Sequence, residues 1–165
     1  LHFCGSGSFL GELQALVDRH GMKGLVTFHG HMLRVELLRL LPTVDAIVVP
    51  TTADFVEGFN KVVIEGVLAS VPTITTDVCP ATEYVKGAVL LFEAGNVIDL
   101  VSKLQYVLFN ESIRKKLIEN SFNVSCYFYN PANGWEVAFR EIVESVKRSE
   151  IPTGKLVPLE NPVRF

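Results

Sequence analysis

The feature that most constrains the fold of this chain is a regular alternation of short apolar runs with segments of helical periodicity. The apolar runs cover residues 1–4, 25–28, 46–49, 73–75 and 88–92. Between the first four runs, apolar residues recur three and four positions apart, as on one face of a helix. Strands that alternate with helices at this spacing favour right-handed crossovers and a parallel sheet. The sequence therefore predicts an α/β fold, a doubly wound, Rossmann-like parallel sheet with helices on both faces.

The predicted helices cover residues 10–17, 33–41 and 60–69, and the pattern after residue 97 is helical only. Breaks are expected near Asn110 and near Asn130, and the last helix is expected to end at about Lys147. That last helix carries Trp135, Phe139 and other apolar residues at helical spacing, which we expect in the core. Residues 151–165 contain three prolines and one glycine and show no period. We therefore expect one domain over 1–147 and an extended C-terminal tail over 148–165.

Composition limits the classes to which the chain can belong. Its 165 residues are 48% hydrophobic and 20% charged, which is enough for one ordinary core and argues against disorder. Two complete nucleotide-binding lobes do not fit in this length. No apolar run reaches the roughly 18 residues of a membrane span. A net charge of −3 without a basic tract argues against nucleic acid as a partner.

The three cysteines and the first residues bear on the compartment and on the extent of the chain. Cys4, Cys79 and Cys126 form no CxxC pair, so neither zinc nor a dithiol centre is expected, and we predict reduced, buried thiols in a cytoplasmic protein. The sequence opens inside an apolar run with no initiator Met. We therefore expect a piece of a longer protein.

The most informative stretch is residues 50–65, which leaves the most apolar predicted strand, crosses a loop and enters a helix. Glu57 lies in the loop and Glu65 in the helix, with seven residues between them. Asn60 is the expected helix cap. In doubly wound folds ligands bind at the carboxyl ends of the strands, and a helix start there offers free N–H groups and a positive dipole end. An anion such as a diphosphate is a natural ligand for this arrangement.

Each carboxylate also has a structural interpretation. Glu65 can pair with Lys61 one turn earlier, which contributes a few tenths of a kcal/mol. Glu57 can be a solvated loop acid. Apolar residues surround Glu65 in the sequence, however, so its helix should be buried, and a buried carboxylate needs hydrogen-bond donors such as vicinal hydroxyls.

The nine residues from Glu57 to Glu65, EGFNKVVIE, resemble the E-x7-E motif of retaining glycosyltransferases with the two-lobed GT-B architecture, the glycosyl transferases group 1 family. The resemblance extends over several motifs in the same order, from about residue 1 to about 146, all in the C-terminal, donor-binding lobe. The further matching segments are FCGSG at 3–7, VTFHGH at 26–31, VDAIVVP at 44–50 and VPTITTD at 71–77.

This resemblance implies a hexosyltransferase that retains configuration and transfers sugar from a UDP-, GDP- or ADP-linked donor, without a cofactor or metal. Glu57 would be the catalytic residue facing the transferred sugar, and Glu65 would bind the ribose hydroxyls. The remaining donor-binding residues would be Gly58, Phe59, Asn60 and Lys61, along the sugar and diphosphate, and Gly30 and His31, near the base. The implied partners are the nucleotide-sugar, an N-terminal lobe of the same protein and an acceptor glycan or lipid. The full-length protein could be membrane-peripheral.

The chain departs from the family pattern in ways that bear on activity. The Arg and Lys that normally serve the diphosphate lie in a segment before the Gly-x-Gly strand, which these residues do not contain, and Lys61 is the only cation beside the motif. Asn60 and Ser70 stand where the family usually has Gly, and Gly66 stands where it usually has Ala. We therefore expect a donor-binding module with little or no turnover without its other lobe.

Two other functions are compatible with the pattern. One is a non-enzymatic Rossmann-like interaction domain in which both carboxylates are structural. The other is a sugar-nucleotide epimerase of the same two-lobed architecture, although such enzymes do not share the full run around Glu57. His29 and His31 flank Gly30 without a third ligand nearby, which argues against a metal site.

Overall fold

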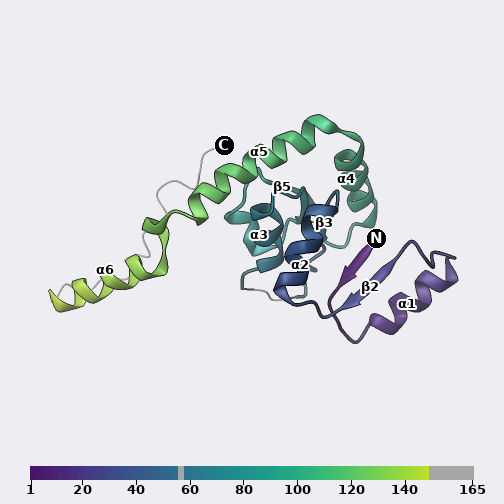
Figure 1. Ribbon diagram of the computed structural model, residues 1–165, viewed down its shortest axis with the longest axis horizontal. Helices are drawn as coiled ribbons and strands as arrows, with labels where there is room; N and C mark the ends of the chain where they lie inside the picture. The colour runs from purple at the N-terminus through teal and green to yellow at the C-terminus, as the bar shows by residue number, and fades with distance from the viewer. Residues whose placement is uncertain (56–57, 149–165) are drawn as a thin grey trace. The chain divides into compact units, whose positions relative to one another are not determined.

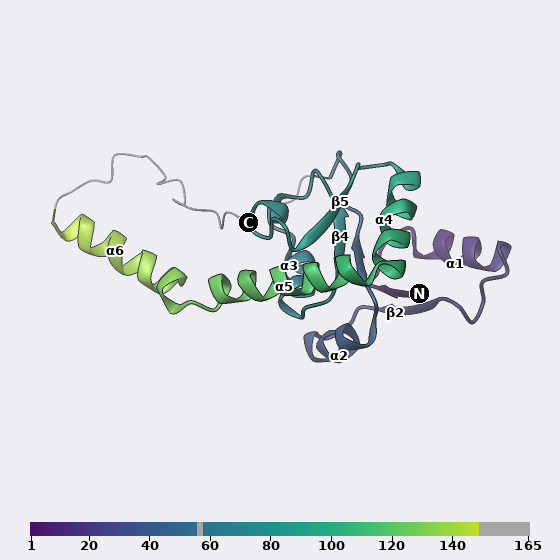
Figure 2. The ribbon, with the colours of Figure 1, turned by 90° about the horizontal axis from the view of Figure 1, so that it is seen from above.

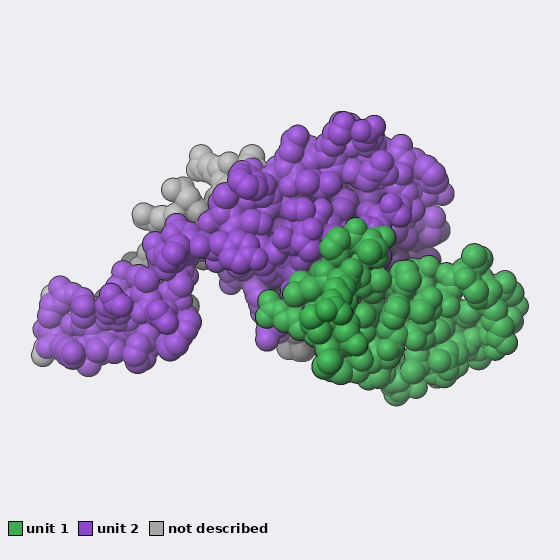
Figure 3. Space-filling model, viewed as in Figure 1, with its two compact units in different colours: residues 1–43 green, residues 44–165 purple. Residues whose placement is uncertain are grey.

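The computed structural model describes residues 1–55 and 58–148 (Figure 1). These residues divide into two compact units, Leu1–Thr43 and Val44–Phe165, which Figure 3 distinguishes by colour.

The first unit contains two parallel strands and the helix that connects them. Phe3 lies opposite Phe28 in the register, and their rings stack with centroids 5.1 Å apart. Leu41 is the single buried residue among residues 1–43. The first unit therefore has almost no buried apolar core of its own. Its elements are β1 (His2–Cys4), α1 (Leu10–Arg19), β2 (Thr27–Gly30), α2 (Arg34–Leu40) and the 3-10 helix η1 (Leu41–Thr43).

The second unit is built on a three-stranded parallel sheet in the order β3-β4-β5. Every residue of the central strand β4 is buried, as expected for a parallel strand covered on both faces. Helix α3 connects the first two strands, and the short 3-10 helix η2 connects the second pair. Their bounds are β3 (Ile47–Val49), α3 (Lys61–Leu68), β4 (Thr73–Thr76), η2 (Pro80–Glu83) and β5 (Val89–Phe92).

Two apolar clusters cover the two faces of this sheet. On one face, Val63 and Val67 of α3 pack with Val85 and with Val124 of a later helix. On the other face, a separate cluster joins Ile74 of β4 to the helices that follow β5. Figure 2 shows α3 and α4 on opposite sides of β4 and β5. The sheet is thus sandwiched between helices, and the carboxyl ends of its strands point toward the loop that precedes α3.

The rest of the described chain is helical. Asn96 and Asn110 cap α4 and α5, and each accepts a hydrogen bond from the backbone N–H three residues later. None of the described helices combines the length and the apolar character that a membrane span requires. The elements are α4 (Val97–Phe109), α5 (Glu111–Phe128), the 3-10 helix η3 (Pro131–Asn133) and α6 (Trp135–Lys147).

The α/β class with parallel strands is confirmed, and two smaller expectations are wrong. The apolar face of α6 is exposed, with 74% of Trp135 and 55% of Phe139 accessible, because η3 is the main element that α6 contacts among the described residues. All three thiols are free, but only Cys79 is buried, whereas Cys4 and Cys126 are exposed. The predicted tail lies outside the described residues except for Arg148, and the single domain over 1–147 stays a prediction.

Candidate functional site

The candidate site is the segment that leaves β3 and enters α3. Asn60 is buried in an extended conformation, and its Oδ1 accepts a hydrogen bond from the N–H of Val63 at 3.2 Å. The predicted cap is therefore confirmed. The N–H groups of Lys61 and Val62 are in the first turn and have no intrahelical acceptor. They leave the positive end of the α3 dipole available to a ligand.

Glu65 lies one turn into α3 at the margin of its buried face. Ile64 and Gly66 on either side of it are buried, while Glu65 itself is half-buried. Its carboxylate makes no hydrogen bond or ion pair with any described residue, so the structural alternative, a pair with Lys61, is not formed. A half-buried carboxylate without a protein partner is well suited to accept hydrogen bonds from a ligand.

The remaining predicted residues of this loop are on the surface. Gly58, Phe59 and Lys61 are exposed, and the Phe59 ring packs edge to face against Tyr84 with centroids 5.4 Å apart. Glu57, the predicted catalytic residue, lies outside the described residues.

Gly30 and His31 belong to the first unit, at the end of β2. Gly30 has φ +64°, in the left-handed region that favours glycine, and its carbonyl accepts a hydrogen bond from the N–H of Gly5 at 2.7 Å. His31 is exposed. Within the described ranges, no three His, Cys, Asp or Glu side chains gather closely enough to hold a metal ion.

Positive charges are few in this part of the second unit. Lys61 is the only Lys or Arg between residues 44 and 85. In the loop before α3, a hydrogen bond from the Thr52 side chain lowers the pKa of the exposed Asp54 carboxyl, and a backbone hydrogen bond adds to this effect. Asp54 therefore stays ionised. Lys61 in the first turn of α3 adds positive charge to the amino end of that helix, where the α3 dipole is also positive.

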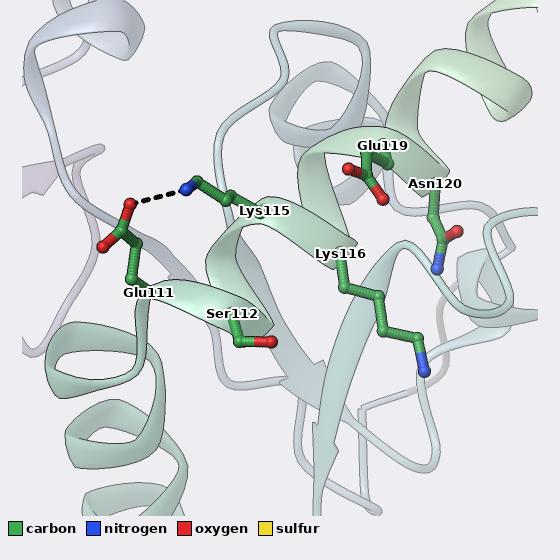
Figure 4. A pocket seen from close by; sticks show the side chains of 6 residues that line it. All are labelled: Glu111, Ser112, Lys115, Lys116, Glu119 and Asn120. Atoms are coloured by element: carbon green, nitrogen blue, oxygen red, sulfur yellow. Dashed lines mark ion pairs between the residues drawn. The ribbon is translucent and has the colours of Figure 1, made fainter.

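A pocket elsewhere on the second unit is lined entirely by α5 (Figure 4). Lys115 makes an ion pair with Glu111 at 2.7 Å. The other two charged residues that line the pocket, Lys116 and Glu119, have opposite charges, so the lining carries no net charge. None of its lining residues comes from a strand end. We do not assign the donor site to it.

Tyr84 is the residue of this region that sequence reasoning missed. It caps η2 at its C-terminal end and contacts Phe59, which precedes it by more than twenty residues. No local pattern signals such a contact, because it depends on how the loops after β3 and β4 meet.

A parallel sheet between helices, with the capped start of α3 following the carboxyl end of β3, is the architecture of doubly wound α/β domains. The family model described as glycosyl transferases group 1 matches residues 1–124. The chain belongs to this family, and the match to its C-terminal lobe predicted from the sequence is confirmed. No curated protein matches the chain.

Solved structures share the fold at low sequence identity. Sucrose-phosphate synthase from Thermosynechococcus elongatus is 20% identical with a TM-score of 0.70, covering 90% of this chain and 38% of that one. Anabaena Alr3699/HepE, solved in complex with UDP, is 19% identical with a TM-score of 0.71, covering 89% of this chain and 40% of that one. A glycosyltransferase from Rickettsia africae is 18% identical with a TM-score of 0.71, covering 89% of this chain and 39% of that one. The chain thus spans about 40% of the length of these GT-B proteins.

Proposed function

We propose that this chain is the donor-binding lobe of a retaining glycosyltransferase and that it binds a nucleotide-sugar at the amino end of α3. Joined to an N-terminal lobe of the same protein, it would transfer the sugar to an acceptor glycan or lipid. Family membership supports the reaction class. The solved relative HepE, which was crystallised with UDP-glucose, supports a nucleotide-linked donor.

The observation that carries this proposal is the half-buried carboxylate of Glu65, which no described residue pairs with, in the helix whose start Asn60 caps. The ribose of a nucleotide offers two vicinal hydroxyls, which can donate to both oxygens of one carboxylate. The diphosphate would accept hydrogen bonds from the first-turn N–H groups of α3. Glu57 would face the transferred sugar, and Gly30 and His31 would approach the base.

The chemistry requires that negative charge on the departing diphosphate be stabilised. Lys61 and the α3 dipole supply positive charge, but one exposed lysine is a weak substitute for a pair of cations. We therefore infer weak binding of the donor by these residues alone and little turnover.

The test is titration calorimetry of the chain with UDP, GDP and ADP. We expect weak binding of at least one of them, and Glu65→Ala should abolish it because the ribose loses its acceptor. Glu119→Ala is the matched control, since it removes an exposed carboxylate from α5. Failure of all three nucleotides to bind to the folded chain would overturn the proposal, as would equal binding by both variants.

A further inference from the structure

The loop in front of α3 contacts a residue that no part of the motif includes. Tyr84 meets the ring of Phe59 edge to face, with centroids 5.4 Å apart and an interplanar angle of 76°. This is a favoured geometry for aromatic pairs, because the positive edge of one ring meets the negative face of the other.

Both partners are attached to well-anchored backbone. Phe59 directly precedes Asn60, which is buried and caps α3. Tyr84 directly precedes Val85, which is fully buried in the cluster that also holds Val63 of α3. The backbone N–H of Tyr84 also donates to the carbonyl of Ala81 at 3.0 Å. The pair therefore connects the loop after β3 to the loop after β4.

The position of the pair is at the surface and not in the core. Phe59 is 41% exposed and Tyr84 is 44% exposed, so both rings are accessible from solvent. In this position, the contact limits how far Phe59 and its neighbour Gly58 can move away from the first turn of α3.

We propose that Tyr84 is a positioning residue of the donor site, whose ring holds Phe59 and the backbone beside it in front of the amino end of α3. This inference rests on the proposed function. If Tyr84 holds this backbone in place, it should affect binding of the diphosphate in particular. In the proposed function the diphosphate is the part of the donor that contacts the backbone from Gly58 to Lys61.

The experiment compares Tyr84→Ala with Tyr84→Phe in the 165-residue chain. The probes are the nucleoside diphosphate among UDP, GDP and ADP that binds most tightly and the corresponding monophosphate. Tyr84→Ala should weaken binding of the diphosphate by about threefold to tenfold, the range expected for one aromatic pair, and should change binding of the monophosphate much less. Tyr84→Phe keeps the ring and should bind both as the wild type does. Tyr106→Ala, which removes a tyrosine of similar exposure from α4, is the control.

A second measurement does not depend on a ligand. Amide hydrogen exchange at Phe59 and Asn60 should be faster in Tyr84→Ala than in the wild type and in Tyr84→Phe. If Tyr84→Ala changes neither this exchange nor the ratio of diphosphate to monophosphate affinity, Tyr84 has no positioning role. That result is distinct from failure of the proposed function. If the proposed function fails, the wild type binds none of the nucleotides, and Glu65→Ala therefore causes no further loss of binding.

Discussion

Gly66 of α3 lies so close to Thr73 of β4 that a β-carbon on Gly66 would be 2.6 Å from Oγ1 of Thr73. The same β-carbon would lie 2.8 Å from Cδ1 of Ile47 in β3. Real β-carbons essentially never approach other heavy atoms this closely. The closeness of α3 to the sheet thus depends on the missing side chain, which explains why this chain has Gly where the resemblance leads one to expect Ala.

We expect Gly66→Ala to destabilise the second unit by about 1–2 kcal/mol, because the overpacking exceeds the gain in helix propensity. Urea denaturation followed by circular dichroism measures the change. Gly11→Ala in α1 is the control, since nothing lies within 4 Å of its added β-carbon, and it should not destabilise. Thr73→Ala should reduce the cost of Gly66→Ala in a double-mutant cycle. Additive effects of the two changes would contradict the steric explanation.

Two neighbouring threonines of β4 provide a second test, because both are buried but their hydroxyls differ in hydrogen bonding. Thr75 is fully buried and Thr76 nearly so, but Oγ1 of Thr75 donates to the carbonyl of Val49 at 2.9 Å, whereas Oγ1 of Thr76 has no partner among the described residues. A buried polar atom without a partner carries a desolvation cost that is not repaid. Thr76→Val should therefore raise the free energy of unfolding by about 1 kcal/mol, and Thr75→Val should lower it by a similar amount. Thermal and urea denaturation of the two variants check this, and equal losses in both would contradict it.

Much of the fold follows from local chemistry and could be predicted from the sequence. Asn60, Asn96 and Asn110 begin helices because a short amide side chain caps the first turn. Strand and helix boundaries agree with the expected ones within about two residues, and β2 begins at Thr27 where the apolar run begins at residue 25.

The features that were not predicted depend on contacts between distant segments. The expected parallel strands form two separate sheets in the described residues, β1-β2 in the first unit and β3-β4-β5 in the second. The exposure of α6 and the contact of Phe59 with Tyr84 likewise depend on which surfaces meet. For the site, the unpaired state of Glu65 could not be predicted, because a lysine one turn away offered a partner of opposite charge.

Ser70 ends α3 in a conformation that is unfavourable for a residue with a side chain. Its φ is +56°, the one positive value among the described non-glycine residues. The N–H groups of Ser70 and Val71 donate to the carbonyls of Val67 and Gly66, which is the Schellman pattern that usually has glycine at this position. Ser70→Gly should stabilise the chain by about 0.5–1 kcal/mol. Glycine removes the strain of the left-handed conformation, and this gain exceeds the cost of the greater conformational entropy that glycine gives to the unfolded chain.

The control for this change is Ser102→Gly, at an exposed position in the middle of α4. It should cost about 0.5–1 kcal/mol, since there glycine only adds freedom to the unfolded chain. Urea midpoints of the two variants should therefore move in opposite directions. A loss of stability in both would show that Ser70 makes a contribution that its backbone angle does not account for.

The cap of α3 allows stability and binding to be separated, because α5 begins with a cap of the same geometry. Oδ1 of Asn60 and Oδ1 of Asn110 each accept a backbone hydrogen bond at 3.2 Å, from Val63 and Ile113 respectively. Replacing either asparagine by alanine should cost about 1 kcal/mol in denaturation experiments. Only Asn60→Ala should also weaken nucleoside diphosphate binding, by several-fold, because fraying of the first turn of α3 moves the N–H groups that we assign to the diphosphate. Asn60→Gly should cost only a few tenths of a kcal/mol and keep binding nearly intact. If Asn60→Ala and Asn110→Ala bind the nucleotide equally well at equal cost in stability, the amino end of α3 is not where the diphosphate lies.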